Sequence, residues 1–424
     1  MQIIRHWLSR ADPAQPALVL PDGRALCFGD LITRRGRSGL QVLEGDAQTL
    51  ALGLIDCALG GGTALLLPPG LTPETREALV AQARRAASPQ LALIVTTSGS
   101  TGAPKGVRLT WRAVAAAARI GARGLDLRPG DAWLACLPLH FVGGATILFR
   151  TLRAGATAVV HDGFDVETVA RTLVDRRITH ISLVPAMLAK LLEGAVSPAP
   201  SFGPPTPSPA LADGETACAL RANPPAALRC ALVGGAALAP ALEEKARAAG
   251  WPIRLSYGMT ETCATLLVDG RPLPGVKVRL ADDGTLEVSS PARMDGYLGE
   301  AEAGEWLATR DLAMITADGR VSIHGRADEM LISGGVNVHP LEVEARLAAC
   351  PGVHQAGVTG LPDPVWGDLI ACAYEGEADE AAVEAWCRAT LPSPRRPRRL
   401  LRVSRLPRLA SGKLDRRALR SLWP

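Results

Sequence analysis

A run of hydroxyl and glycine residues with one lysine follows a short apolar stretch. Residues 91–95 (LALIV) include two β-branched residues, which predicts a buried strand. Glycines let backbone N–H groups turn toward an anion, hydroxyls add donors, and a lysine adds a mobile positive charge. The pattern predicts a polyphosphate-binding loop, although it lacks the spacing of the P-loop NTPases, and a plain surface turn is the alternative. The predicted loop residues are Thr97, Ser98, Gly99, Ser100, Thr101, Gly102 and Lys105.

A second motif, residues 256–262 (SYGMTET), combines an aromatic ring, a flexible glycine, hydroxyls and a carboxylate. Tyr257 can stack on adenine, Thr260 can hydrogen-bond an α-phosphate, and Glu261 can hold Mg²⁺ through oxygen. A strand followed by a polar turn is the alternative interpretation. The predicted nucleotide contacts are Ser256, Tyr257, Gly258 and Met259, with Thr260 and Glu261 as catalytic candidates and Glu261 as the metal ligand.

A third motif near the C-terminus, LPRLASGKLDRRAL (406–419), places Lys413 after a Ser-Gly pair. A compact ammonium group can bridge an attacking carboxylate and an α-phosphate, two anions that otherwise repel each other. Lys413 is therefore a catalytic candidate, and a solvated surface lysine is the alternative.

These motifs, with WLATRDLA (306–313) and HGRADEMLISGGVNVHPLEVE (324–344), occur in an order that resembles the adenylate-forming enzymes. That superfamily contains the AMP-binding acyl-CoA synthetases, the luciferases and the adenylation domains of peptide synthetases. The resemblance covers residues 91–419 and implies ATP, Mg²⁺ and coenzyme A as cofactors. It also implies a two-step reaction: a carboxylate attacks the α-phosphate of ATP and releases pyrophosphate, and a thiol then displaces AMP from the acyl-adenylate.

The resemblance implies further roles for residues between the motifs. Asp311, expected after a strand, would accept both ribose hydroxyls, and Arg326 would contact ribose or phosphate. Members of the family commonly have glycine before this aspartate, where the present sequence has Arg310. Asp328 stands at the hinge about which the C-terminal domain swings. The remaining implied positions are Gly234, Gly235 and Ala236 beside adenine, and Ser333, Gly334 and Gly335 in a turn that enters the site for the second half-reaction.

The acid substrate is expected to lie against segments 137–144, 182–188, 234–236 and 257–264. Amino-acid-activating members generally carry an aspartate in the first segment, and its absence here disfavours an amino-acid substrate. A doubly charged acid would favour a basic or hydroxyl-rich pocket. The predicted pocket residues are His140, Phe141, Ser182, Pro185 and Thr262, with His140 also a catalytic candidate.

Two segments, residues 179–193 and 228–265, most resemble the o-succinylbenzoate–CoA ligases of menaquinone biosynthesis. The alternative within the class is another aryl or short-chain acyl-CoA ligase. The alternative from a different class is a non-catalytic nucleotide-binding or nucleic-acid-binding protein, which the presence of Glu261 and Lys413 disfavours.

The elements that must position these residues predict an α/β fold. Strand and helix patterns alternate over residues 131–193, which indicates a doubly wound layer. Short strands over 271–323 predict a small β subdomain, and a small α+β domain follows. The predicted organisation is an N-terminal ATP- and acid-binding domain (1–325) with a shortened front end, a hinge (326–328) and a mobile C-terminal domain (329–424). The Pro- and Ser-rich segment 195–216 is expected to be a flexible loop.

Composition places the chain in an ordinary class. A net charge of +4 over 424 residues is too small to demand a nucleic-acid partner, and no aromatics interleave the basic stretch 392–408. The nine cysteines are scattered without a CxxC pair, which disfavours a zinc site and fits reduced thiols in the cytoplasm. The N-terminus has no long apolar core, so we expect neither a signal peptide nor a membrane anchor. The expected partners are a small carboxylic acid, ATP and CoA, bound by a monomer or a homo-oligomer.

Overall fold

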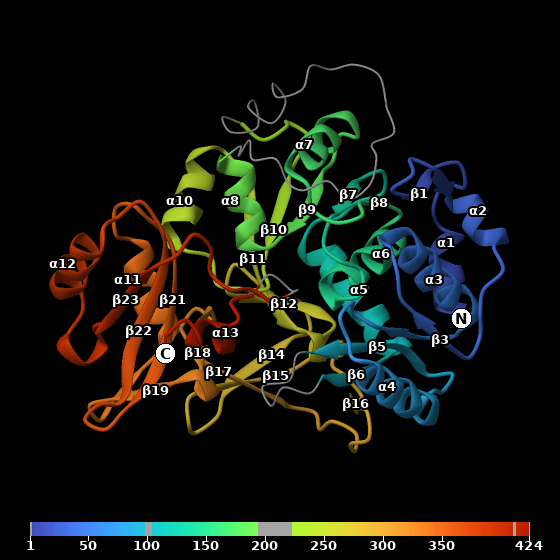
Figure 1. Ribbon diagram of the computed structural model, residues 1–424. Helices are drawn as coiled ribbons and strands as arrows, with labels where there is room; N and C mark the ends of the chain where they lie inside the picture. The colour runs from blue at the N-terminus through green and yellow to red at the C-terminus, as the bar shows by residue number, and fades with distance from the viewer. Residues whose placement is uncertain (1, 98–103, 194–222, 410–412, 424) are drawn as a thin grey trace.

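The computed structural model describes residues 2–97, 104–193, 223–409 and 413–423 (Figure 1). A nine-stranded sheet, ordered β13-β12-β11-β10-β9-β7-β8-β1-β2, forms its largest layer. The strands from β11 to β1 pair in parallel, whereas β2, β12 and β13 add antiparallel edges. The strands are β1 (Pro16–Val19), β2 (Ala25–Cys27), β7 (Ala132–Ala135), β8 (Thr157–Val160), β9 (His180–Leu183), β10 (Cys230–Val233), β11 (Ile253–Met259), β12 (Ala264–Val268) and β13 (Arg271–Pro272).

A five-stranded sheet, ordered β16-β6-β5-β4-β3, packs below the first sheet in Figure 1. Strands β3, β4 and β5 pair in parallel. The chain then turns back from β5 into the antiparallel strand β6, which places Thr97 opposite Lys105. The two ends of the predicted phosphate loop are therefore cross-strand neighbours. The strands are β3 (Leu40–Leu43), β4 (Thr63–Leu66), β5 (Leu91–Thr97), β6 (Lys105–Thr110) and β16 (Gly296–Tyr297).

Helices cover both faces of each sheet, because the buried strand residues face alternate sides. In β10, Leu232 faces the core shared with the smaller sheet, and Val233 faces a second core on the outer side. The shared core holds α1 (Gln2–Leu8), α2 (Phe28–Thr33), α3 (Ala47–Gly60), α5 (Trp111–Gly124) and α6 (Val142–Ala154). The outer helices are α7 (Val166–Asp175), α8 (Pro185–Glu193) and α10 (Pro240–Ala248) on the larger sheet, and α4 (Pro73–Ala86) on the smaller one.

Local sequence sets the ends of these helices. Thr110 caps α5 by accepting a hydrogen bond from the Ala113 N–H at 3.1 Å, as its sequence predicts. Asp46 caps α3 in the same way, with Thr49 as donor at 2.7 Å. Helix α6 ends at Gly155, whose φ of 69° is a left-handed conformation that glycine adopts without strain.

A four-stranded antiparallel sheet forms the small β subdomain and is ordered β14-β15-β17-β18. Its strands are β14 (Lys277–Leu280), β15 (Thr285–Ser289), β17 (Leu307–Ile315) and β18 (Val321–Arg326). One expectation is wrong in detail, because Asp311 lies inside β17 and not after a strand. The strand that begins at Ile253 ends at Met259, where the short 3₁₀ helix η1 (Thr260–Thr262) follows.

The C-terminal domain begins after the 3₁₀ helix η2 (Ala327–Glu329) and is coloured orange to red in Figure 1. One face of its sheet packs against α11 and α12, and the other contacts the last helix, α13. Its elements are β19 (Leu331–Ser333), β20 (Val336–Val338), α11 (Pro340–Ala348), β21 (Val353–Asp363), β22 (Gly367–Gly376), α12 (Glu380–Thr390), η3 (Ser393–Arg395), β23 (Arg399–Arg402) and α13 (Arg416–Arg420).

The doubly wound layer, the β subdomain and the α+β C-terminal domain were all predicted from the sequence. The segment 195–216 lies outside the described residues. Among the described residues, no helix combines the length and the apolar character needed to cross a bilayer.

Candidate active site

The predicted site residues gather where the parallel strands of the large sheet end. Pro185 opens α8 just after β9, Gly234 follows β10, and Ser256 lies in the adjacent strand β11. A Cβ atom on Gly234 would lie 3.1 Å from the Ser256 side chain, so a larger residue here would require Ser256 to shift by a few tenths of an ångström. Ligands of open α/β sheets bind at the carboxyl ends of the strands. The fold therefore brings together segments that are distant in sequence.

Tyr257, Asp311, Arg326 and Asp328 form a bonded cluster, which we call the nucleotide side. The Tyr257 hydroxyl donates to Asp311 Oδ2 at 2.5 Å, and Arg326 Nη1 donates to Asp311 Oδ1 at 3.4 Å. Arg326 also binds both oxygens of Asp328, at 2.8 and 3.0 Å. The pairing of β17 with β18 sets Asp311 opposite Arg326, which explains why these two side chains meet.

Burial and neighbouring charge act in opposite directions on this cluster. Burial raises the pKa of Asp311, while the hydrogen bond from Tyr257 and the charges of Arg326 and Lys413 oppose the rise. The pKa of Asp328 is lowered, chiefly by its hydrogen bonds from Arg326. An ionised Asp311 is an acceptor-only group and suits two ribose hydroxyls, as the resemblance implied.

Arg310 has the backbone conformation of a glycine. Its φ is 61°, in the left-handed region that costs a residue with a Cβ atom about 1–2 kcal/mol. The cause is a bulge in β17. Thr285 of β15 pairs with Leu312, and Glu287 pairs with Ala308, so more residues of β17 than of β15 lie between the two pairs. Sequence reasoning noted the missing glycine but did not predict that the arginine keeps the glycine geometry.

Glu261 is the predicted metal ligand, and its carboxylate accepts a hydrogen bond from the Tyr297 hydroxyl at 2.9 Å. Lys105 lies on the other side of Tyr297, with Nζ 4.8 Å from the ring centroid and 3.1 Å from the Glu300 carboxylate. Among the described residues, no three acidic, histidine or cysteine side chains gather as a metal site. One carboxylate still fits Mg²⁺, which commonly takes one or two protein ligands and completes its shell with phosphate oxygens and water.

The predicted loop residues Ser98, Gly99, Ser100, Thr101 and Gly102 lie outside the described residues, as does the Ser-Gly pair before Lys413. Thr260 lies in η1 beside Glu261, but its predicted contact with phosphate stays a prediction. Lys413 is exposed, and its charge is close enough to Asp311 to lower the pKa of that carboxyl. The charge of Lys413 thus lies near the nucleotide side.

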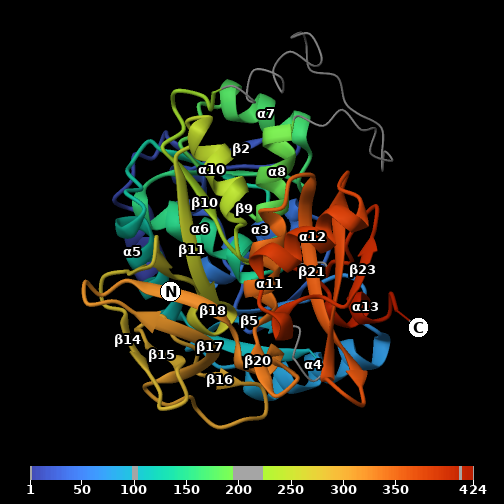
Figure 2. The same cartoon turned by 90° about the vertical axis from the view of Figure 1, so that its left-hand side faces the viewer.

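The Gly334–Gly335 pair forms a hairpin turn between β19 and β20. Both glycines have positive φ angles, 57° and 76°, as a type I′ turn requires. A Cβ atom on Gly334 would lie 3.0 Å from the Trp366 ring, so the turn packs within the C-terminal domain. Its predicted entry into the active site stays a prediction. Figure 2 shows the C-terminal domain beside the β17–β18 end of the small β sheet.

Two of the predicted acid-pocket residues use their hydroxyls for the fold. Ser182 is buried, and its oxygen accepts from Trp133 Nε1 at 3.1 Å. Thr262 is also buried and donates to the carbonyl oxygen of Met259 at 3.1 Å, which fixes the turn after β11. His140 and Phe141 lie together before α6, with ring centroids 4.4 Å apart. Burial lowers the pKa of His140, so its imidazole is neutral at pH 7.

Arg150 on α6 is the residue that sequence reasoning missed. Arg150 is only 2% exposed, and its Nη2 atom donates a hydrogen bond to Thr265 Oγ1 at 3.0 Å. Its guanidinium carbon lies 5.7 Å from the Trp133 ring centroid, and Nε is buried without a partner. Among the described residues, no carboxylate pairs with it. We call Ser182, Trp133, Arg150 and Thr265 the acid side, because Ser182 belongs to a predicted pocket segment and Thr265 bonds Ser256 of the nucleotide motif.

A buried guanidinium that has no carboxylate partner is costly, which makes Arg150 a candidate functional residue. Burial lowers the pKa of Arg150 to about 10, which leaves it charged at pH 7. Leaving a charge buried and unpaired costs several kcal/mol. Gly121 on α5 makes room for it, since a Cβ atom there would lie 2.6 Å from Arg150 Nε. The one sequence signal was a single arginine in an otherwise apolar helix segment, ATILFRTL.

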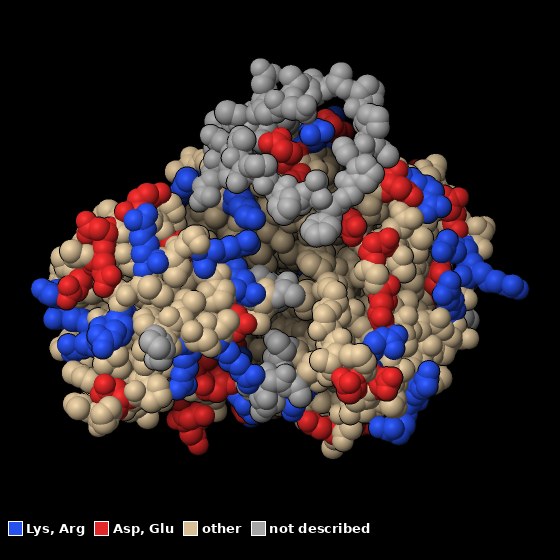
Figure 3. Space-filling view, in the orientation of Figure 1, with Lys and Arg blue, Asp and Glu red and all other residues tan. Residues whose placement is uncertain are grey.

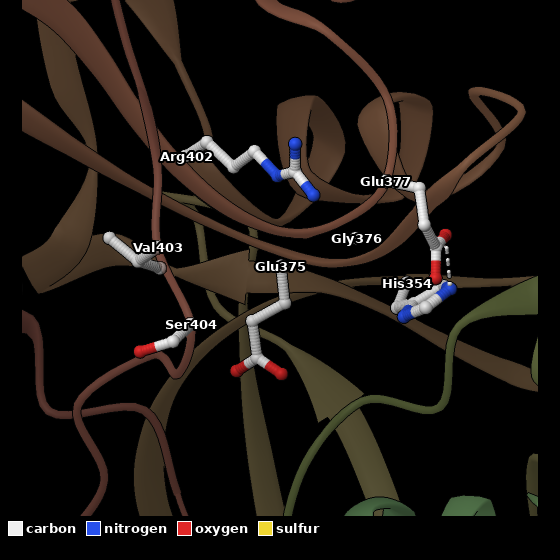
Figure 4. Close-up of a pocket in the computed structure, with 7 residues that line it drawn as sticks. All are labelled: His354, Glu375, Gly376, Glu377, Arg402, Val403 and Ser404. Atoms are coloured by element: carbon white, nitrogen blue, oxygen red, sulfur yellow. Dashed lines mark ion pairs between the residues drawn. The ribbon is translucent and has the colours of Figure 1, made fainter.

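A separate cavity of about 480 Å³ lies at the surface of the C-terminal domain. Figure 4 shows its His354–Glu377 ion pair, 3.0 Å long, with Glu375 and Arg402 nearby. None of its lining residues belongs to the motifs above, so it is not the candidate site. The space-filling view is instead hollowed near its centre, with Lys and Arg side chains along the left-hand margin of the hollow (Figure 3).

Comparison with known proteins identifies similar enzymes and similar structures. A 2-succinylbenzoate–CoA ligase from Bacillus pumilus (strain SAFR-032) is 32% identical over 361 residues, which are 78% of this chain and 69% of the relative. The structure of o-succinylbenzoate CoA synthetase (MenE) from Bacillus subtilis with the acyl-adenylate intermediate OSB-AMP has a TM-score of 0.81 at 25% identity, covering 98% of this chain and 97% of that one. A double mutant of the same protein with the product analogue OSB-NCoA has a TM-score of 0.65 at the same identity and coverage.

The family descriptions "AMP-binding enzyme" and "AMP-binding enzyme C-terminal domain" match residues 56–300 and 342–413. The predicted resemblance and fold class are confirmed. Because the first match spans more than half of the 424 residues, this chain belongs to the AMP-binding enzyme family.

Proposed function

We propose that this chain is an ATP-dependent ligase that joins 2-succinylbenzoate to coenzyme A through an acyl-adenylate, as a step of menaquinone biosynthesis. Family membership supports the reaction class. Relatives at 32% and 34% identity that bear the name 2-succinylbenzoate–CoA ligase support the substrate. The observation that carries the substrate assignment is the buried Arg150, which has no acid partner among the described residues.

The substrate has two carboxylates, and only one of them is activated. The other carboxylate must also be bound, and an anion removed from water without a partner is costly. Arg150 supplies a fixed cation on the acid side, with no carboxylate partner among the described residues. A guanidinium also suits a carboxylate geometrically, because it can donate two parallel hydrogen bonds. A monocarboxylic aryl acid would leave Arg150 buried and unpaired.

The nucleotide side would hold ATP. Asp311 accepts the ribose hydroxyls, and Tyr257 and Arg326 fix its orientation through the hydrogen bonds that they donate to it. Glu261, oriented by Tyr297, is the residue that would hold Mg²⁺. The metal ion would neutralise charge on the phosphate oxygens.

Lys413 would act in the chemical step. As an oxygen of the acid attacks the α-phosphorus, the bond to the bridging oxygen breaks and pyrophosphate leaves. Negative charge concentrates between the two anions, and a positioned ammonium group stabilises that charge more than it stabilises the bound substrates. In the second step the CoA sulfur attacks the acyl carbon, loses its proton, and displaces AMP.

The orientation of the C-terminal domain fits the first step. The charge of Lys413 is close enough to Asp311 to lower the pKa of that carboxyl, and the TM-score is 0.81 against the acyl-adenylate complex but 0.65 against the complex with the product analogue. We propose that the C-terminal domain turns about Asp328 between the two steps and replaces Lys413 with the Gly334–Gly335 turn. A cytoplasmic location belongs to the same proposal, because the eight cysteines in the described residues are all free thiols.

The test is pyrophosphate release from MgATP with a panel of acids, measured with and without CoA. We expect 2-succinylbenzoate to exceed benzoate, short fatty acids and amino acids in kcat/KM, and thioester to form only when CoA is present. A preference for a monocarboxylic aryl or short-chain acid would overturn the substrate and leave the reaction class. No pyrophosphate release with any acid would overturn the reaction class as well.

A further inference from the structure

Arg310 lies where the N-terminal domain meets the hinge. The bulge in β17 is fixed by Thr309, whose hydroxyl donates to the Leu286 carbonyl at 2.8 Å and accepts from the Asp311 N–H at 3.1 Å. The bulge turns Asp311 inward to Tyr257, and it forces Arg310 into a left-handed conformation with a mostly exposed side chain. Strained residues of this kind persist where the surrounding structure fixes them, commonly at functional sites.

The side chain of Arg310 reaches the hinge. Its Nη1 atom lies 3.9 Å from Asp328 Oδ2, on the carboxylate that also binds Arg326. The positive charge of Arg310 helps to lower the pKa of Asp328. An ion pair this long and this exposed contributes little to folding, and it does not offset the strain in the backbone of Arg310. Folding stability therefore does not explain an arginine at this position.

The two arginines differ in how they depend on the domain orientation. Arg326 is two residues from Asp328 in the chain, so their contact is local. Arg310 is on another strand, and its contact with Asp328 depends on where the hinge has placed that carboxylate. A contact made in one orientation and lost in the other shifts the population toward the first.

We propose that Arg310 is a positioning residue that holds Asp328, and with it the C-terminal domain, in the orientation that presents Lys413 to Asp311. This inference rests on the proposed function, because it assigns the contact to the adenylating half-reaction alone. Arg310 touches no reacting atom and acts through Asp328. An exposed ion pair corresponds to a population shift of about 1.4- to 5-fold, which sets the size of the effect.

The experiment compares Arg310→Gly and Arg310→Lys with wild type in three measurements. These are the Tm, the single-turnover rate of acyl-adenylate formation, and the rate of thioester formation from preformed acyl-adenylate and CoA. Glycine removes both the strain and the charge, so we expect an equal or higher Tm with adenylation about two- to fivefold slower. Thioester formation should be unchanged or faster. Lysine keeps the charge and the strain, so it should restore adenylation without raising the Tm.

Arg177 offers a matched control. It is also an exposed arginine in the left-handed region, with a φ of 47°, and it follows α7, away from the hinge. Arg177→Gly should therefore change the Tm in the same direction and leave both half-reactions unchanged. Arg310→Gly in an Asp328→Asn background should cause no further loss of adenylation, because the partner charge is already absent.

Three outcomes would overturn the inference. Equal changes in both half-reactions would assign Arg310 a general structural role, and a higher KM for ATP at unchanged kcat would assign it to phosphate binding. Unchanged rates in Arg310→Gly would show that the contact has no effect. In each case Lys413→Ala must still lose adenylation, which leaves the proposed function standing. A wild-type chain that makes no acyl-adenylate overturns the proposed function instead.

Discussion

The nucleotide side and the acid side lie next to each other and treat charge in opposite ways. On the nucleotide side, Asp311 accepts from Tyr257 and Arg326, and Asp328 accepts from Arg326, so each charge has a partner within the protein. On the acid side, Arg150 has a hydroxyl and an aromatic face but no carboxylate among the described residues. The nucleotide side is thus pre-organised before ATP binds, whereas the acid side lacks one anion that a substrate can supply.

The difference between the two sides separates the binding of ATP from the selection of the acid substrate. A network that is complete without ligand can hold a constant substrate in a fixed geometry. Under the proposed function, a buried cation that lacks its partner favours a doubly charged acid, because the second carboxylate would compensate it. Substitutions on the two sides should therefore have different kinetic signatures.

The charge of Lys413 lies near Asp311, and the removal of this lysine should have the largest effect. Lys413→Ala removes the ammonium group that stabilises the charge between carboxylate and α-phosphate. We expect acyl-adenylate formation to slow by about 10²–10³. Thioester formation from preformed acyl-adenylate should stay near the wild-type rate, as single-turnover assays of each half-reaction can measure. Equal losses in both would show that Lys413 does not act on the adenylating step alone.

Arg150→Met should separate the two sides. Methionine fills much of the volume without charge, and replacing a buried charge with an apolar residue is often neutral or stabilising, so the Tm should hold. Losing a charge-assisted hydrogen bond should lower kcat/KM for 2-succinylbenzoate about 10- to 150-fold. The KM for ATP should not change. A similar loss with benzoate as substrate would mean that Arg150 supports the fold and does not select the acid.

Lys105 tests the phosphate end of the nucleotide side. Its ammonium group pairs with Glu300, and both side chains are about half exposed. Lys105→Ala should raise the KM for ATP about tenfold, through one lost charge-assisted contact. The matched variant Glu300→Gln releases Lys105 and should leave the KM for ATP equal or lower. An unchanged KM in Lys105→Ala would make the predicted loop a surface turn.

The nucleotide side could be predicted from the sequence because its residues lie in contiguous motifs. Tyr257, Asp311 and Arg326 were each assigned from neighbouring residues, but the bonds among them were not, since they depend on a strand pairing across 15 residues and on a contact between two sheets across 54 residues. The bulge that bends Arg310 into a glycine conformation depends on the register against β15, which a single strand does not reveal.

The acid side could not be predicted in the same way. Arg150 lies in an apolar helix, and its burial follows from the packing of α5 against α6 around Gly121. Ser182 and Thr262 were predicted pocket residues on the strength of their hydroxyls, but strand and turn geometry directs those hydroxyls to Trp133 and Met259. Side-chain direction at the end of a strand is set by the neighbours and not by the residue type.

The smallest effect concerns pH and the ionisation of Asp311. Its carboxylate must be ionised to accept the ribose hydroxyls, and burial raises its pKa above the ordinary value of about 3.9. Activity at low ATP should therefore fall on the acidic side at a higher pH than for an exposed aspartate. Tyr257→Phe keeps the ring but removes a hydrogen bond that favours the ionised form, so the pKa of Asp311 rises further and the acidic limb of kcat/KM for ATP moves to higher pH. Tyr297→Phe removes a hydroxyl that bonds Glu261 and should leave that limb in place.

The stability of the fold should depend on pH through the same shift in the pKa of Asp311. The folded-state pKa lies above the unfolded one, so folding takes up a proton, and the stabilising contribution of Asp311 is lost as pH rises through its folded-state pKa. Low pH should thus weaken ATP binding, while the protonation of Asp311 itself favours folding. The measurements are pH profiles of kcat/KM for ATP and of Tm, taken in the same buffers for wild type and for Asp311→Asn. The assignment would be contradicted if kcat/KM and Tm fell together at low pH, and equally in both proteins.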